Sequence, residues 1–310
     1  MKWKKLGLVC RPNEKWWSRT HCYVPTPEIL SSLGVIRVYF SSWDEDWRGR
    51  IGYANFDIKD PSKLIYQSEG PILNIGEPGT FDSDGVLPSQ AFYDNGKHLL
   101  YYVGIQRTCT DKVNLAFVNL AIEDKNKKFQ KIGNTPLLDR CAGEEFIRSS
   151  SYIIKENDVT MMWYTSSETG WVDYGKSSVH SWTSYPTYGI SLITTKRSYV
   201  GAFDKSIRCT GLKKDYIAIG RPWVIKEDKM YKMWYSGRSP SIAYDLLYAE
   251  SKDGIMWEMK DSGIKKSDEG YDSEMVCFGA VISVNGTKYM YYNGNRHGKD
   301  GILLAVLEKL

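Results

Sequence analysis

The chain has 310 residues, of which 42% are hydrophobic and 25% charged, a composition that excludes a disordered protein. Its 41 Lys and Arg against 37 Asp and Glu leave a net charge of +4, too small a bias to indicate nucleic acid as a partner. No run of about 18 apolar residues is present, so the sequence predicts no membrane span. Aromatic residues reach 14%, which favours short strands and a recognition surface of flat rings.

The first 17 residues begin with basic side chains, but their apolar stretch runs only from Leu6 to Cys10 before Arg11 interrupts it. A secretion signal needs a longer apolar segment and a small-residue cleavage site, so none is predicted and the expected location is the cytoplasm. The cysteines never form a CxxC pair, and reduced, mostly structural thiols are expected at the six positions. These positions are Cys10, Cys22, Cys109, Cys141, Cys209 and Cys277.

A repeat of two or three large apolar or aromatic residues followed by small or polar ones runs through the chain. Its third residues lie at positions 40, 102, 164, 235 and 292, with spacings of 62, 62, 71 and 57 residues. Each segment is rich in strand-forming residues, and four of the five follow a charged or Asn/Gly turn. The five anchor segments are Val38–Ser42, Leu100–Gly104, Met162–Ser166, Met233–Gly237 and Met290–Gly294.

Further strands surround each anchor segment, one before the turn and one or two after it. Four antiparallel strands repeated five times predict an all-β fold, a five-bladed β-propeller that forms a single domain over residues 1–310. The alternative is a pair of β-sandwiches with accidental similarity. Residues Lys4 to Val9 are expected to pair with Ile302 to Val306 and so to close the ring.

Acidic residues recur at a fixed distance before the anchors. Because the innermost strand of each blade lines the channel and opens at one face, residues at equal distances are expected to converge there. Four of the five residues twenty positions back are acidic, and two carboxylates lie eighteen back. The first set is Thr20, Asp82, Glu144, Asp215 and Asp272; the second is Cys22, Asp84, Phe146, Ile217 and Glu274. Turns and caps before strands are the alternative role for any one of these acids.

Several motifs carry a resemblance to a known superfamily. They are Arg37–Ser41, Gly79–Ser89, Arg221–Trp223, Asp272–Glu274 and Asn293–Asn295. With the repeat, they make the chain similar to the five-bladed propeller glycoside hydrolases of families 43, 32, 68 and 130. It looks closest to an uncharacterised bacterial branch associated with surface-polysaccharide synthesis. The resemblance implies an enzyme that acts on a glycosidic bond of a small-molecule or oligosaccharide substrate.

The catalytic residues of family 43 do not transfer directly, because His21–Pro27 has no carboxylate where that family has its general base. Cleavage of a glycosidic bond needs a proton donor and a base or nucleophile. Asp84 is therefore expected to act as base or stabiliser and Glu274 as acid. Asp82, Asp272 and Glu145 are the reserve candidates, and an inverting enzyme would hold its two carboxyl groups roughly 6.5 to 9.5 Å apart.

The expected substrate-binding residues are histidines, arginines, tryptophans and asparagines near the same face. Arg148 and Arg221 suit an acidic sugar or phosphate, and an ion pair between blades is the alternative. Tryptophans in the irregular insertion from Ser166 to Pro186 would stack on sugar rings. The full set is His21, Arg148, Arg221, Trp171, Trp182, Asn293, Asn295 and His297.

Other chemistries lack a motif: no HExxH, GxSxG, Walker or GxGxxG pattern and no metal-ligand cluster is present in the sequence, so no cofactor or metal is expected. Three functions remain open at this point. They are a glycoside hydrolase, a glycoside phosphorylase or glycosyltransferase, and a non-catalytic carbohydrate-binding propeller.

Overall fold

The computed structural model describes residues 1–108, 114–173, 184–197, 200–201 and 204–308. In these residues it is almost entirely β, with twenty strands, one 3₁₀ turn (Ser31–Leu33) and a four-residue helical segment, α1 (Asn295–Gly298). No helix of the described part is long and apolar enough to cross a membrane.

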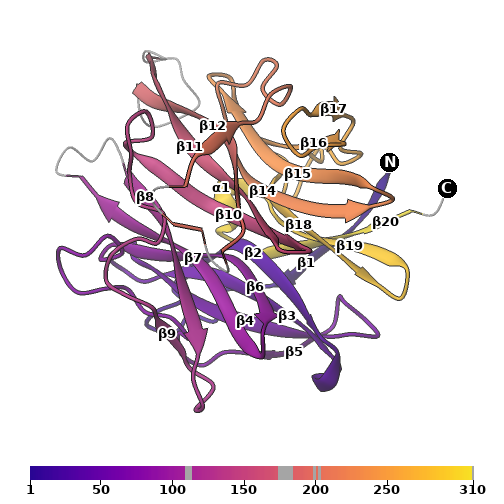
Figure 1. The fold of residues 1–310 in the computed structure, drawn as a ribbon. Helices are drawn as coiled ribbons and strands as arrows, with labels where there is room; N and C mark the ends of the chain where they lie inside the picture. The colour runs from indigo at the N-terminus through magenta and orange to yellow at the C-terminus, as the bar shows by residue number, and fades with distance from the viewer. Residues whose placement is uncertain (109–113, 174–183, 198–199, 202–203, 309–310) are drawn as a thin grey trace.

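Antiparallel pairing groups the described strands into five units of four (Figure 1). Parallel pairs of one or two residues join the first four units into a single sixteen-stranded sheet. The first unit is β2 (Thr20–Leu30), β3 (Val35–Trp43), β4 (Gly49–Asp57) and β5 (Leu64–Gln67). The second is β6 (Gly85–Asp94), β7 (Lys97–Arg107), β8 (Asn114–Glu123) and β9 (Phe129–Lys131). The third is β10 (Ile147–Glu156), β11 (Val159–Asp173), β12 (Ser184–Thr195) and β13 (Ser206–Arg208).

The two remaining units complete the chain. The fourth is β14 (Ala218–Glu227), β15 (Met230–Ser239), β16 (Ile242–Ser251) and β17 (Glu258–Lys260). The fifth is β18 (Cys277–Val284), β19 (Thr287–Asn293), β20 (Ile302–Leu307) and, from the start of the chain, β1 (Trp3–Cys10). The predicted pairing of the two chain ends is confirmed, since Lys4 lies opposite Val306 and Leu8 opposite Leu303 (Figure 1).

The five anchor segments lie in the second strands β3, β7, β11, β15 and β19, as the repeat predicts. In three of the turns before them both central residues adopt positive φ, which makes these turns tight: Asn95 and Gly96, Asp228 and Lys229, and Asn285 and Gly286. Asn and Gly tolerate this conformation, and two such residues in succession match the right-handed twist of the flanking strands.

Side chains of one unit bond to the backbone of the next and hold the units together. Gln90 on β6 exchanges two hydrogen bonds with the backbone of Ile153 on β10, at 3.0 and 2.7 Å. The Trp223 indole N–H donates to the Val281 carbonyl at 2.8 Å, and the Tyr291 hydroxyl donates to the Pro61 carbonyl at 2.8 Å. The first strands also contact one another in cyclic order, from β2 through β6, β10, β14 and β18 back to β2.

Each of the five first strands, all described in full, has a register irregularity near its middle. In four of them a residue other than glycine adopts positive φ there: Val24, Ser150, Arg221 and Phe278. Such strained backbone persists only where surrounding contacts fix it, and bulges redirect the side chains around them. The bulges therefore shape the region around which the first strands gather.

The segment between Ser166 and Pro186, expected to be an irregular insertion, is partly regular. Its described ends extend β11 and β12 into a longer hairpin in which Trp171 lies opposite Pro186. The strand-forming Trp171 and Val172 continue the ladder beyond the anchor segment, which explains the difference from the expectation.

Candidate functional site

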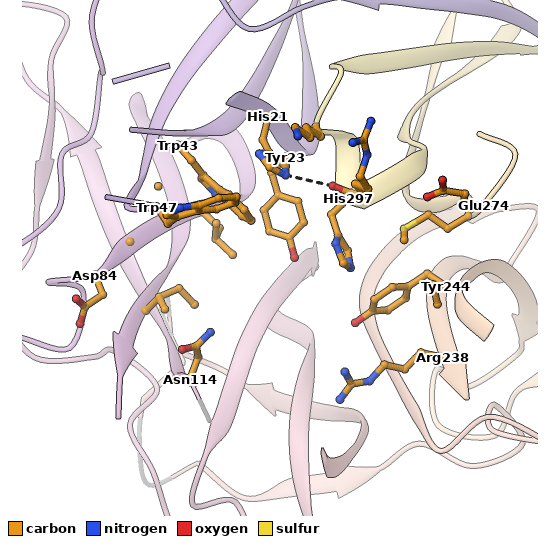
Figure 2. Close-up of a pocket in the computed structure, with 18 of the residues that line it drawn as sticks. His21, Tyr23, Trp43, Trp47, Asp84, Asn114, Arg238, Tyr244, Glu274 and His297 are labelled. Atoms are coloured by element: carbon orange, nitrogen blue, oxygen red, sulfur yellow. Dashed lines mark hydrogen bonds between the residues drawn. The ribbon is translucent and has the colours of Figure 1, made fainter. Parts of the chain in front are cut away.

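A cavity of about 1060 Å³ opens where the first strands begin and the second strands end. His21 and Tyr23 on β2, Trp43 at the end of β3 and Arg238 near the end of β15 all line it (Figure 2). Asp84, directly before β6, adds a carboxylate to the wall. Residues from four of the five units meet here because each unit presents the same end of its strands.

One wall of the cavity is aromatic. The Trp43 and Trp47 rings lie 5.7 Å apart, and His21 stacks on Trp43 with 3.9 Å between ring centroids. Tyr23 meets Trp43 edge-on at 5.7 Å, and Figure 2 shows its hydroxyl pointing into the cavity. Flat rings beside a polar hydroxyl suit a ligand with one apolar face and many hydroxyl groups.

A second aromatic group surrounds His297, which belongs to α1. Its ring stacks with Phe278 at 6.2 Å and meets Tyr23 and Tyr244 edge-on at 6.1 and 5.4 Å. His297 adopts a φ of 59°, so α1 is a strained turn rather than a regular helix. These contacts fix the imidazole at the cavity wall (Figure 2).

His21 is held as a neutral ring. Its Nε2 lies 3.1 Å from the Arg296 carbonyl oxygen, which can only accept, so Nε2 carries the proton. Its Nδ1 then accepts from the Thr20 hydroxyl at 2.9 Å. Burial, with the nearby charge of His297 second, lowers the pKa of His21 to about 4. Both nitrogens are therefore engaged by the protein, and His21 offers the cavity an uncharged ring.

Two carboxylates line the cavity, Asp84 and Glu274. Asp84 Oδ2 accepts hydrogen bonds from the Arg107 backbone N–H at 3.0 Å and the Ser83 hydroxyl at 3.2 Å. Glu274 is exposed, and Asn295 Oδ1 fixes its backbone N–H at 2.7 Å. Figure 2 shows the two carboxylates on opposite sides of the cavity, with Tyr23 and His297 between them.

The acids twenty residues before the anchors take part in a different arrangement. Asp82, Glu144 and Asp272 are 2%, 6% and 5% exposed, and each accepts a hydrogen bond from the tyrosine of its own anchor. The tyrosine distances are 3.2 Å for Tyr102, 2.8 Å for Tyr164 and 2.9 Å for Tyr292. Each acid also pairs with a cation: Lys131 at 2.6 Å, Arg148 at 2.7 Å and Lys5 at 2.7 Å, respectively.

We call each of these three acid–tyrosine–cation groups a brace, because it ties an anchor tyrosine to the loop before its unit. None of the three acids is among the described residues that line the cavity. The expectation that equal spacing brings them to the mouth is therefore not met, and the spacing reflects a repeated internal contact. The fourth unit is an exception, since Tyr235 donates instead to the Leu212 carbonyl at 2.9 Å and Asp215 is exposed.

The two arginines expected at the mouth are buried away from the described cavity lining. Arg148 belongs to a brace and also donates to the Asp139 carbonyl at 2.6 Å. Arg221 donates to the carbonyls of Ser89 and Pro25 at 3.3 and 3.2 Å, which joins β14 to β6 and β2. Burial lowers the pKa of Arg221 to about 10, still high enough to keep its charge. Both arginines connect elements of the fold.

The remaining candidate site residues that are described lie at different places outside the cavity lining. Buried Asn293 bonds to the Val24 N–H at 2.8 Å and to the Cys22 carbonyl at 2.9 Å. Exposed Trp171 packs edge-on against Phe146 at 5.6 Å, and Glu145 is also exposed. None of these three candidates lines the described cavity. Trp182 lies outside the described residues.

Sequence reasoning missed much of the cavity lining, although one signal was available. Counting three residues on from the third residue of an anchor segment gives Trp43 in the first unit, Ile105 in the second and Arg238 in the fourth. All three line the cavity. The position is therefore repeated in space as well as in sequence. Tyr244 and the loop residue Trp47 lie outside this period and carry no equivalent signal. Within the described residues, no group of three or more His, Cys, Asp or Glu is placed to hold a metal ion.

Comparison with known proteins shows to which family the chain belongs. No family model matches it. It is 30% identical to the uncharacterized protein Rv1502 of Mycobacterium tuberculosis over 311 residues, which cover 99% of this chain and 100% of the relative. The chain belongs to the family of Rv1502. A second member, the uncharacterized protein MT1551 of another strain of that species, matches with the same identity and coverage.

Solved structures identify the fold of this family as that of the propeller glycoside hydrolases. A thermostable family-43 glycoside hydrolase superposes with a TM-score of 0.65 at 15% identity, covering 97% of this chain and 94% of its own. An exo-1,5-alpha-L-arabinanase from a bovine ruminal metagenomic library gives 0.60 at 13%, covering 92% of each chain. A glycosyl hydrolase from Bacteroides ovatus gives 0.68 at 14%, with 97% of this chain and 91% of its own covered. The predicted superfamily resemblance is confirmed at the level of the fold.

Proposed function

We propose that residues 1–310 form one five-bladed propeller and that the protein acts on a glycosidic bond in the cavity at its mouth. The five four-stranded units correspond to the blades, and the cyclic contacts between first strands support a closed ring. Pairing of β1 with β20 joins the chain ends within the last blade, which stabilises such a ring.

The observation that carries the functional proposal is the cavity itself. It combines a wall of aromatic rings with two carboxylates on opposite sides, in a fold shared with glycoside hydrolases. Aromatic faces pack on the apolar face of a sugar, and carboxylates supply the proton transfers of glycosidic cleavage. A volume of about 1060 Å³ accommodates more than one sugar ring.

The roles follow from the surroundings of each carboxylate. Two donors orient Asp84 Oδ2, which suits a base that activates water or a group that stabilises positive charge on the sugar. Glu274 lines the opposite wall with its side chain exposed, so a leaving oxygen bound in the cavity can come within its reach. Asp82 and Asp272 are engaged in braces and Glu145 faces solvent elsewhere, so Asp84 and Glu274 are preferred over these reserves.

The experiment measures sugar release from a panel of oligosaccharides with wild type, Asp84→Asn and Glu274→Gln. Each variant is expected to lose about 10²-fold or more in rate, the usual contribution of a general acid or base. Glu269→Gln is the matched control, because Glu269 is an exposed acid near Glu274 that does not line the cavity. Unchanged rates in both site variants would contradict the assignment, and a requirement for phosphate would identify the reaction as phosphorolysis.

A second candidate is a propeller that binds glycans without cleaving them. The separation of Asp84 and Glu274 across the cavity favours it, since the two acids do not form a close pair (Figure 2). This function predicts measurable glycan binding, no product, and binding that survives the Asp84→Asn and Glu274→Gln substitutions.

A further inference from the structure

The cavity is far more basic than the chain as a whole. Its described lining holds five side chains of Lys or Arg and two carboxylates, whereas the whole chain has 41 Lys and Arg against 37 Asp and Glu. The cations come from four separate segments, so one local charge run does not explain the excess. They are Arg107, Arg238, Lys266, Arg296 and Lys299.

Arg238 is the most deeply placed of these cations. It lies on β15, is 8% exposed, and its guanidinium lies 5.0 Å from the centre of the Tyr188 ring. The Tyr188 hydroxyl is hydrogen-bonded to that of Tyr244 at 2.9 Å, which fixes both rings beside the arginine. Figure 2 shows the Arg238 guanidinium next to Tyr244 at the cavity. A planar guanidinium held in place by its neighbours matches the geometry of a carboxylate or phosphate and binds it through paired hydrogen bonds.

The charges of three other cations, Lys266, Arg296 and Lys299, are weakly compensated by the protein, whereas the Arg107 guanidinium donates to the carbonyls of Asp46 and Trp47. The ion pair of Arg296 with Asp300 is long, at 3.6 Å, and both side chains are well exposed, so it offsets little charge. Lys266 and Lys299 form no ion pair with a carboxylate of the described residues. The charges of Lys299 and Arg296 also contribute to lowering the pKa of His21, which is consistent with a positive potential at this wall.

We propose that the cavity selects anionic glycans, that is, sugars that carry a carboxylate or a phosphate group. The sugar ring would pack against Trp43 and Trp47 while its anionic group binds Arg238 and Lys299. Figure 2 places the two tryptophans and Arg238 on different sides of the cavity, as this arrangement requires. This inference rests on the proposed glycan function and narrows it to one chemical class.

Calorimetric binding of matched charged and uncharged sugars tests the inference. Comparing the affinities for trigalacturonate and its methyl ester tests recognition of a carboxylate. Comparing the affinities for glucose 6-phosphate and glucose tests recognition of a phosphate. At least one charged member is expected to bind at least tenfold more tightly than its neutral partner, because hydrogen bonds to a charged group are stronger than those between neutral groups. That preference should shrink as salt is raised, because the outer cations are screened.

The double substitution Lys266→Gln and Lys299→Gln is expected to reduce the preference about tenfold while leaving the neutral sugar unaffected. Lys97→Gln is the matched control, because exposed Lys97 begins β7 at the end of the β6–β7 hairpin far from Asp84 and does not line the cavity. Arg238→Gln, with folding checked by circular dichroism, is expected to remove most of the preference.

Three outcomes overturn the inference. Equal affinity for charged and neutral sugars does so while leaving the proposed glycan function intact. Binding of inorganic phosphate as tight as that of glucose 6-phosphate shows a site for bare anions rather than for glycans. Absence of binding to every sugar in these pairs, and of activity on the oligosaccharide panel, contradicts both the inference and the proposed function.

Discussion

The brace around Glu144 gives the sharpest test of how the repeated acids act. Replacing Glu144 by Gln keeps the shape and still lets the Tyr164 hydroxyl donate, so the change removes chiefly the charge. Arg148, only 1% exposed, then loses the carboxylate 2.7 Å from its Nε. Breaking a buried pair in this way costs about 3 to 5 kcal/mol. Arg148 keeps its bond to the Asp139 carbonyl, so about 3 kcal/mol is expected.

Urea unfolding followed by tryptophan fluorescence measures this loss, with an unchanged slope against denaturant. The matched control is Glu145→Gln. Glu145 follows Glu144 directly, is exposed, and among the described residues its side chain accepts a hydrogen bond only from the Gly143 N–H. That control should change the free energy of unfolding by less than about 0.5 kcal/mol. A Glu144→Gln protein as stable as the control would refute the structural role of the brace.

Two further contacts yield predictions that unfolding experiments check. The pKa of His21 is about 4 in the folded protein against 6.5 ordinarily, so the unfolded chain binds the proton more readily between these values. His21 therefore contributes to the free energy of unfolding above pH 6.5, by at most about 3 kcal/mol, and this contribution is lost as pH falls toward 4. A His21→Asn protein whose free energy of unfolding depends on pH as that of wild type does would contradict this. At Gly211, φ is +79° and an added Cβ would lie 1.9 Å from the Trp257 carbonyl oxygen, so Gly211→Ala should cost about 2 kcal/mol or more in thermal unfolding. Gly133→Ala, where a Cβ meets nothing within 4 Å, is its control, and equal melting temperatures would refute the strain.

The strand order was predictable because it depends on local patterns. Anchor segments such as Leu100–Gly104 combine strand-forming residues with a preceding turn at Asn95 and Gly96, and both features act over a few residues. The pairing of β1 with β20 was also predictable, since the expected propeller needs its ends joined and both segments are apolar enough for strands.

The site was less predictable because spacing gives the period of a repeat and not the direction of a side chain. Asp82 and Asp84 are two residues apart in the loop before β6, yet Asp82 bonds to Tyr102 and Lys131 while Asp84 faces the cavity. The partner Lys131 lies on the outer strand β9, and no local pattern links it to Asp82. Cavity residues on connecting loops, such as Lys266, follow no period at all.

Strand ends from different units are proposed to create a glycan site at one face, and crystals soaked with trigalacturonate test this proposal. We expect sugar density in the cavity between the Trp43 ring and the Arg238 guanidinium, with a sugar oxygen near Asp84 or Glu274. Density only at the opposite ends of the strands, or an empty cavity under conditions where the sugar binds in solution, would contradict it.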